Sequence, residues 1–101
     1  MSAAAQFRAA YRSALSGHLA DRGESSLRVA YELGRDAVER RLSVLDLAAV
    51  YHEGLIAALR QSNSGEIEEL TQAAADFFLE SLSAFEMIQR GFSEAREAAM
   101  V

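Results

Sequence analysis

His52 is the first candidate for a chemical role in this sequence, because a histidine within a helix can take part in phosphoryl transfer. It lies in the helix-forming stretch Tyr51-His52-Glu53-Gly54. An exposed histidine on a helical bundle can carry a phosphoryl group, typically with a lysine close after it. The sequence contains no lysine, and Glu53 would repel an incoming phosphoryl group. We therefore favour a packing or partner-contact role for His52, and keep a histidine phosphotransfer domain as an alternative.

Other catalytic and metal-binding patterns are absent from the sequence. A di-metal bundle needs Glu-x-x-His pairs, but none occurs, and the two histidines belong to different predicted helices. Asp76, Glu80 and Glu86 are spread around their helix, which indicates a solvated face. There is no cysteine, no Gly-rich phosphate loop and no nucleophile elbow. The sequence thus predicts a protein that is not an enzyme and binds no metal, cofactor or small-molecule substrate.

The composition favours a single all-α domain over residues 1–101. The 101 residues include no proline and are rich in Ala, Leu, Glu and Arg, which form helices well. No apolar run approaches the roughly 18–20 residues that span a bilayer, and the N-terminus lacks the features of a secretory signal. Since cysteine is also absent, we expect a cytoplasmic protein.

The net charge of −5 is unevenly distributed along the chain. Residues 1–62 hold eight Arg against seven Asp and Glu, whereas residues 63–101 hold two Arg against eight. An acidic chain without a basic stripe cannot neutralise phosphates or bind anionic lipid well. We therefore expect neither nucleic acid nor membrane among its partners.

Apolar residues at three- and four-residue spacing predict four helices that pack as a four-helix bundle-like domain. These helices are expected over residues 3–20, 25–41, 43–60 and 66–99. Ser2 is the expected N-cap of the first helix, and Ser43 with Asp46 the cap of the third. We expect Gly23 to end the first helix in a left-handed conformation, and Gly34 to mark close approach of a neighbouring helix.

The fourth predicted helix is unusually long. Nothing interrupts it except Gly91, a weak breaker, so an unbroken helix would extend about 50 Å at about 1.5 Å per residue. The three earlier helices would be about half as long. The C-terminal end of the fourth helix is therefore expected to project beyond the bundle.

The segment from Asp76 to Phe92 holds more large apolar side chains than one helix face can bury. One stripe suffices to pack a bundle: Ile67, Leu70, Ala74, Phe77, Ser81, Ile88, Phe92 and Ala95. A second, rotated stripe contains Phe78, Leu82 and Phe85, with Leu79 and Met87 further round. We predict that Phe78, Leu82, Phe85 and Met87 form a homodimer interface. The alternative is a wide apolar face that meets two neighbouring helices within one monomer.

Two stretches are the most distinctive in the chain, Ala30-Tyr31-Glu32-Leu33-Gly34-Arg35 and Phe77-Phe78-Leu79-Glu80-Ser81-Leu82-Ser83. The resemblance to one family rests on these two stretches, on Tyr11-Arg12-Ser13-Ala14-Leu15 and on the segment that continues to Phe92. It covers nearly the whole chain. The chain resembles the N-terminal regulatory domain of RsbU-type serine phosphatases, the PP2C-like enzymes of bacterial stress partner-switching systems. Many relatives carry proline where Ala84 sits, so a straighter fourth helix is expected here.

This resemblance implies a helical module that homodimerises, binds a switch kinase of the RsbT type and regulates an attached output domain. The output domain would be a serine/threonine phosphatase or another signalling domain beyond Val101, and the chain an N-terminal fragment. We place the kinase contact on the second and third helices, at Tyr31, Glu32, Arg35, Tyr51, His52 and Glu53. A free-standing helical adaptor is the remaining alternative.

Overall fold

A computed structural model describes residues 2–100 of the chain. Over this range the chain forms α1 (Ala3–Ala20), α2 (Glu24–Glu39), α3 (Val44–Gln61) and α4 (Ile67–Met100), and it contains no strand. A short 3-10 helix, η1 (Ser64–Glu66), connects α3 to α4. The predicted all-α class and the four-helix organisation are confirmed.

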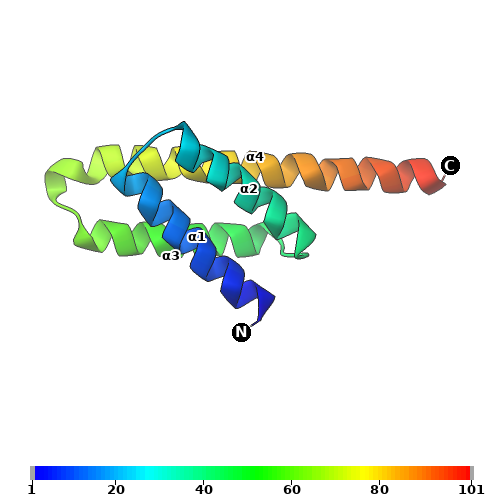
Figure 1. Cartoon of the computed structure of the whole chain (residues 1–101), viewed down its shortest axis with the longest axis horizontal. Helices are drawn as coiled ribbons and strands as arrows, with labels where there is room; N and C mark the ends of the chain where they lie inside the picture. The colour runs from blue at the N-terminus through cyan, green and yellow to red at the C-terminus, as the bar shows by residue number, and fades with distance from the viewer. Residues whose placement is uncertain (1, 101) are drawn as a thin grey trace.

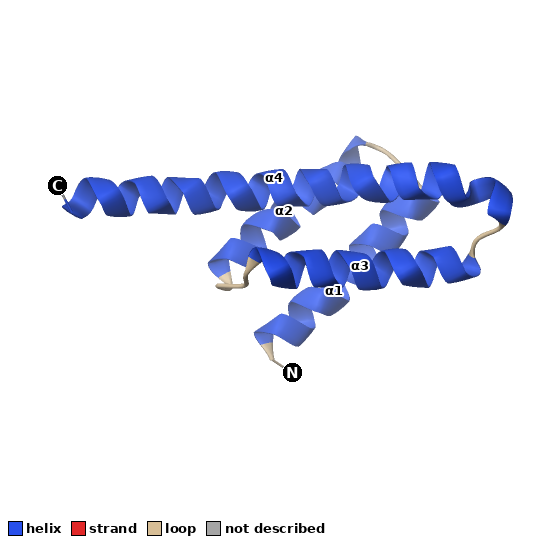
Figure 2. Ribbon diagram, turned by 180° about the vertical axis from the view of Figure 1, so that it is seen from behind, coloured by secondary structure: helices blue, strands red, loops and turns tan. Residues whose placement is uncertain are grey.

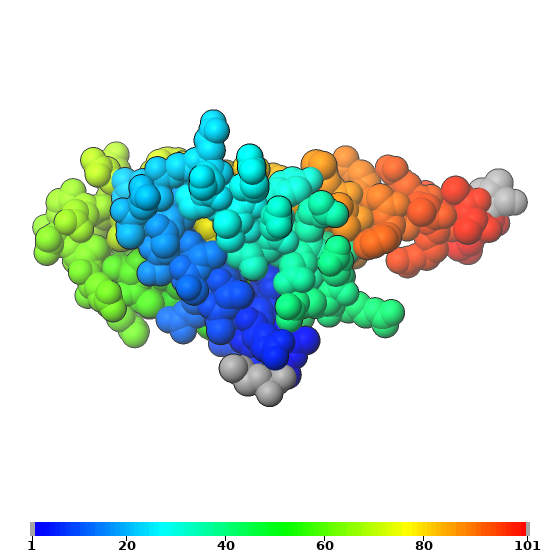
Figure 3. All heavy atoms as spheres, viewed as in Figure 1, coloured from blue at the N-terminus to red at the C-terminus, as the bar shows by residue number. Residues whose placement is uncertain are grey.

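The helices form two layers of two, as Figures 1 and 2 show from opposite sides. α1 and α2 lie obliquely across α3 and α4, which run antiparallel to one another. α4 continues well past the other helices, so the molecule measures 56 × 29 × 20 Å. In the space-filling view the C-terminal half of α4 stands out as an arm, and residues 89–100 are all exposed (Figure 3). The expected projection of the fourth helix is confirmed.

Local capping explains where two of the helices begin. The Ser2 Oγ accepts a hydrogen bond from the Ala5 N–H at 3.1 Å. The Ser43 Oγ accepts from the Asp46 N–H at 3.2 Å, and the Asp46 carboxylate accepts from the Ser43 N–H at 2.8 Å. These bonds satisfy N–H groups that have no partner within the first turn of a helix. Both predicted caps are therefore confirmed.

The predicted end of α1 at Ala20 is confirmed, but the predicted conformation of Gly23 and the predicted end of α2 are wrong. Gly23 has a φ of 179°, which is extended backbone, and it precedes α2 as its N-cap rather than ending α1 in a left-handed conformation. α2 ends at Glu39 rather than Arg41, because Arg41 itself adopts the left-handed conformation with a φ of 61°. The Leu42 N–H then donates to the Ala37 carbonyl at 2.9 Å, which closes the helix end.

Replacing Arg41 by glycine should stabilise the fold. A non-glycine residue in the left-handed region costs about 1–2 kcal/mol of stability, a cost that glycine avoids. Part of this gain is lost again, because glycine has more conformational freedom in the unfolded chain. We expect Arg41→Gly to raise the free energy of unfolding by about 0.5–1 kcal/mol in urea titrations followed by far-UV circular dichroism. Arg60→Gly, at an exposed helical position, should instead lower it by about 1 kcal/mol. An Arg41→Gly variant no more stable than wild type would contradict the strain at Arg41.

The closest helix contact joins α2 to α4 at Gly34. A Cβ atom on Gly34 would lie 2.0 Å from the Ser81 carbonyl oxygen and 3.0 Å from the Ala84 Cβ. Since the nearest atoms belong to the backbone of α4, only glycine fits at this position. The close approach predicted for Gly34 is confirmed, and Ala84, fully buried, lies at the crossing.

A buried hydrogen bond ties α1 to the same point of α4. The Ser81 Oγ donates to the Phe78 carbonyl at 2.8 Å and accepts from the Tyr11 hydroxyl at 2.8 Å. Burial raises the pKa of Tyr11, so its phenol stays protonated and available as a donor. Ser81 therefore contacts both α1 and α2, and fixes the position of α4 in the bundle. The largest fully buried apolar and aromatic side chains of the core are Phe7, Tyr11, Leu15, Leu47, Val50 and Phe77.

Candidate functional site

Three of the six residues predicted to bind a partner lie together on the outer side of α2. Tyr31 is half-buried, and Glu32 and Arg35 are exposed. Val29, with 45% of its surface exposed, lines a shallow groove together with Glu32 and Arg35, whereas Tyr31 lies at the other edge of this surface, beside Glu80 of α4. We call Val29, Tyr31, Glu32 and Arg35 the α2 surface. It offers one cation, one anion, an aromatic ring and an apolar side chain, a mixture that suits a protein partner.

The other three predicted partner residues lie on α3, in the opposite layer of the bundle (Figures 1 and 2). The Tyr51 ring is half-buried and stacks on Phe78, with 4.2 Å between ring centroids. Partial burial raises the pKa of Tyr51. His52 is exposed on the same helix. The structure therefore does not bring the six residues together into one continuous surface.

Glu53 is already engaged within the chain. Its carboxylate accepts two hydrogen bonds from the Arg8 guanidinium of α1, at 2.7 and 2.8 Å. The Arg8 hydrogen bond lowers the pKa of Glu53, so the carboxylate stays charged at neutral pH. Both side chains are substantially solvent-exposed, so water and salt screen the pair and it contributes little to stability. Glu53 thus connects α1 to α3.

The charged residues of α3 all lie along its edge toward α1. Asp46, Glu53 and Arg60 are seven residues apart in sequence, which places them on one line along the helix. Glu53 shows that this line faces α1, since it meets Arg8 there. The opposite edge of α3 carries no Asp, Glu or Arg, a pattern readable from the sequence alone.

An apolar face extends from that uncharged edge across to α4. We call it the α3–α4 face; Figure 2 shows the two helices side by side in front. Leu45 is 76% exposed and Leu79 is 57% exposed, while Tyr51, Leu55, Phe78 and Leu82 are half-buried against the core. The face consists of Val44, Leu45, Ala48, Tyr51, Leu55, Ile56 and Leu59 from α3 and Ala75, Phe78, Leu79 and Leu82 from α4, with His52 among them.

The structure divides the four residues predicted for the dimer interface. Phe78 and Leu82 lie on the α3–α4 face. Phe85 is only 6% exposed and packs in the core, so its assignment to an intermolecular contact is wrong. Met87 is exposed, but it is nine residues from Phe78, which places it on the opposite side of α4. The single-monomer alternative therefore holds for Phe85. Phe78 and Leu82 are only partly covered within the chain and Leu79 is exposed, so an interface at these positions stays a prediction.

Beyond the bundle, the core stripe of α4 continues without a partner helix. Ala74, Phe77 and Ser81 are buried and Ile88 is partly buried. The same stripe then reaches Phe92, which is 54% exposed, and the exposed Ala95 and Ala99. Their spacing of four, three and four residues is typical of helices that pair with another helix.

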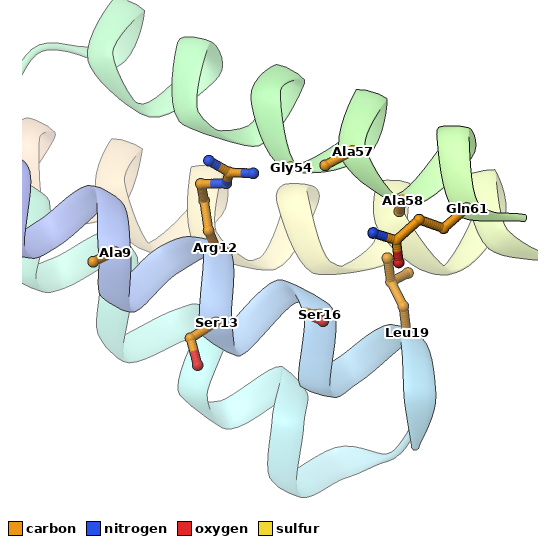
Figure 4. Close-up of a pocket in the computed structure, with 9 residues that line it drawn as sticks. All are labelled: Ala9, Arg12, Ser13, Ser16, Leu19, Gly54, Ala57, Ala58 and Gln61. Carbon is orange, nitrogen blue, oxygen red and sulfur yellow. The ribbon is translucent and has the colours of Figure 1, made fainter.

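A shallow groove separates α1 from α3 (Figure 4). The two helices approach closely at Gly54, where an added Cβ atom would lie only 2.7 Å from the Leu15 Cδ2. The groove contains no carboxylate or histidine, so it offers no general base or metal ligand. Its lining consists of Ala9, Arg12, Ser13, Ser16, Leu19, Gly54, Ala57, Ala58 and Gln61.

The described part of the chain holds no cluster of metal-ligating side chains. Nowhere in residues 2–100 do three His, Asp or Glu side chains gather around a site for an ion. Asp76, Glu80 and Glu86 lie apart along α4, as expected for solvated acids. In the same range, no helix is both long and apolar enough to cross a membrane.

Sequence reasoning overlooked His18. It continues the buried stripe of α1, three residues after Leu15 and seven after Tyr11, and only 3% of its surface is exposed. That spacing is the signal that could have identified it as buried.

Comparison with known families identifies one match. Residues 9–88 match the family model described as the N-terminal domain of the phosphoserine phosphatase RsbU. Comparisons with curated proteins and with solved structures returned no match.

Proposed function

The chain belongs to the family of RsbU N-terminal domains, and we therefore propose that it is a dimeric regulatory domain that binds a switch kinase of the RsbT type. Family membership makes it a regulatory module of RsbU-type phosphatases and not their catalytic domain. In the proposal it homodimerises, binds the kinase in the cytoplasm and regulates an attached output domain, a serine/threonine phosphatase, in bacterial stress signalling. The observation that carries this proposal is the separation of the α2 surface from the α3–α4 face.

The α3–α4 face suits a second copy of the same chain. A two-fold dimer brings one patch against itself, so any charge in the patch would oppose its own kind near the axis. The uncharged edge of α3 and the apolar edge of α4 avoid that repulsion, even though each chain carries a net charge of −5. Burying exposed apolar area gains about 25 cal/mol per Å². Leu45 and Leu79 offer the most to gain.

The α2 surface suits the kinase, because it lies on the other layer and stays free in such a dimer. Arg35 and Glu32 supply charges of both signs, and Val29 and Tyr31 supply apolar contact. Such a mixture gives specificity through complementary charges and affinity through burial.

The α2–α4 crossing connects the kinase surface to the projecting arm. Gly34 lies in the same helix as the α2 surface, and it rests on the backbone of α4 at Ser81. Since the two backbones touch, a shift of α2 moves α4 rather than being absorbed by side chains. In the proposal, kinase binding changes how the two α4 arms of the dimer pair along Phe92, Ala95 and Ala99, and this change reaches the output domain.

Reversal of the charge of Arg35 tests the kinase surface. We expect Arg35→Glu to weaken binding of an RsbT-type kinase at least about tenfold, or about 1.4 kcal/mol, in isothermal titration calorimetry. Dimerisation should be unchanged, because Arg35 lies away from the α3–α4 face.

Arg60→Glu is the matched control, since Arg60 is an exposed arginine on α3. It should leave kinase affinity unchanged, and His52→Ala should do the same because His52 lies on the α3–α4 face. Equal affinities of wild type and Arg35→Glu would refute the α2 surface as the kinase site.

A further inference from the structure

His18 is a buried titratable side chain that neither interaction surface uses. It lies in the last turn of α1 and is 3% exposed. Its Nδ1 lies 2.5 Å from the Ser26 Oγ in the first turn of α2, and its ring centroid lies 5.6 Å from that of Phe77 in α4. The Ser26 hydroxyl also reaches the Gly23 carbonyl at 3.0 Å. One imidazole therefore joins three helices where α1 turns into α2.

The surroundings favour a neutral ring. Burial is the main cause that lowers the pKa of His18, and the nearby Arg22 cation lowers it further. The Asp76 carboxylate of α4 and a backbone hydrogen bond with Ala73 act in the opposite direction and are outweighed. α2 presents its positively polarised N-terminal end, with Glu24 in the same turn.

We propose that His18 acts as a proton-sensitive latch, whose neutral ring holds the α1–α2 corner (residues 18–26) on α4. An imidazolium needs hydration that this closed corner does not provide. On protonation the ring moves out to water, and the contacts with Ser26 and Phe77 are lost. The α1–α2 corner then loosens while the α2–α4 crossing at Gly34, further along α2, stays packed.

The direction of the pH dependence follows from linkage. In the unfolded chain His18 takes up its proton near the ordinary histidine pKa of 6.5, and in the folded chain only at lower pH. Below 6.5 the unfolded state therefore binds more protons, so the free energy of unfolding falls as the pH decreases. The stabilisation by the neutral ring is fully present above that pH. The free energy of unfolding stops falling once the pH is below the pKa of His18 in the folded chain.

The test compares urea unfolding of wild type and His18→Gln at neutral and mildly acidic pH, at one protein concentration. Glutamine keeps a polar side chain beside Ser26 but cannot gain a proton. We expect the midpoint of wild type to fall further between the two conditions than that of His18→Gln. Equal pH dependence of wild type and His18→Gln would overturn the latch.

Titration of the wild-type histidine rings by NMR keeps the proposal testable if His18→Gln does not fold. The His18 resonances should titrate with a midpoint below 6.5, and the amide signals of Gly23 and Ser26 should change with the same midpoint. A His18 midpoint at or above 6.5, or corner amides that do not respond, would overturn the proposal equally well.

Discussion

Replacing Gly34 by alanine will lower the free energy of unfolding by about 1–3 kcal/mol, and by more if the helices cannot separate. The added methyl group would lie 2.0 Å from the Ser81 carbonyl oxygen, closer than any stable contact. The obstacle is backbone, so relief requires α2 or α4 to move and disturbs the Tyr11–Ser81 hydrogen bond. The intrinsic preference of alanine for helices, about 1 kcal/mol, offsets only part of this loss.

Gly17→Ala and Gly91→Ala are matched controls for that experiment. Both glycines are helical, and a Cβ on either would meet nothing within 4 Å. Each substitution should raise the free energy of unfolding by about 0.5–1 kcal/mol. All four proteins should be compared in urea at one protein concentration, because association shifts apparent stability. A Gly34→Ala variant as stable as these controls would show that α2 and α4 do not touch.

Placing a charge on the α3–α4 face should separate the proposed dimer. In a two-fold interface, Leu79→Glu introduces two carboxylates into an apolar contact, where neither has a partner. We expect the dimer dissociation constant to rise at least about a hundredfold, or about 2.7 kcal/mol, in sedimentation equilibrium. Leu45→Glu should act in the same way from α3.

Met87→Glu is the decisive control for this face. Met87 is 55% exposed against 57% for Leu79, and both lie on α4. Met87 is eight residues further along, about two turns toward the C-terminus and roughly 80° round the helix. The dimer should survive Met87→Glu. If Met87→Glu dissociates the dimer and Leu79→Glu does not, the interface lies further toward the C-terminal end of α4, around Met87.

Local chemistry made most of the fold predictable from sequence. Ser2 and Ser43 signal helix starts because their side chains bond to the following turn. Gly34 signals a close crossing because a mid-helix glycine is unfavourable unless space demands it. The end of α2 was misplaced, because nothing in the type of residue at Arg41 indicates a left-handed backbone. Arginine has no preference for that region, and the conformation appears only in the local hydrogen bond from the Leu42 N–H to the Ala37 carbonyl that closes the helix end.

The interaction surfaces were less predictable, because they depend on which helices share a layer. Tyr31 and Tyr51 each occupy an edge of an amphipathic helix, but the sequence does not say that α2 and α3 lie in opposite layers. Phe85 follows the same three- and four-residue spacing as Phe78 and Leu82. Only the position of the neighbouring helices decides that Phe85 is buried while Leu82 remains half-exposed.

The mass of the wild-type chain in solution decides whether the chain dimerises. The account predicts that light scattering at tens of micromolar gives twice the chain mass of 11.0 kDa. An apolar face this broad would otherwise remain in contact with water. A mass of one chain at that concentration would contradict the dimer, and with it the assignment of the α3–α4 face.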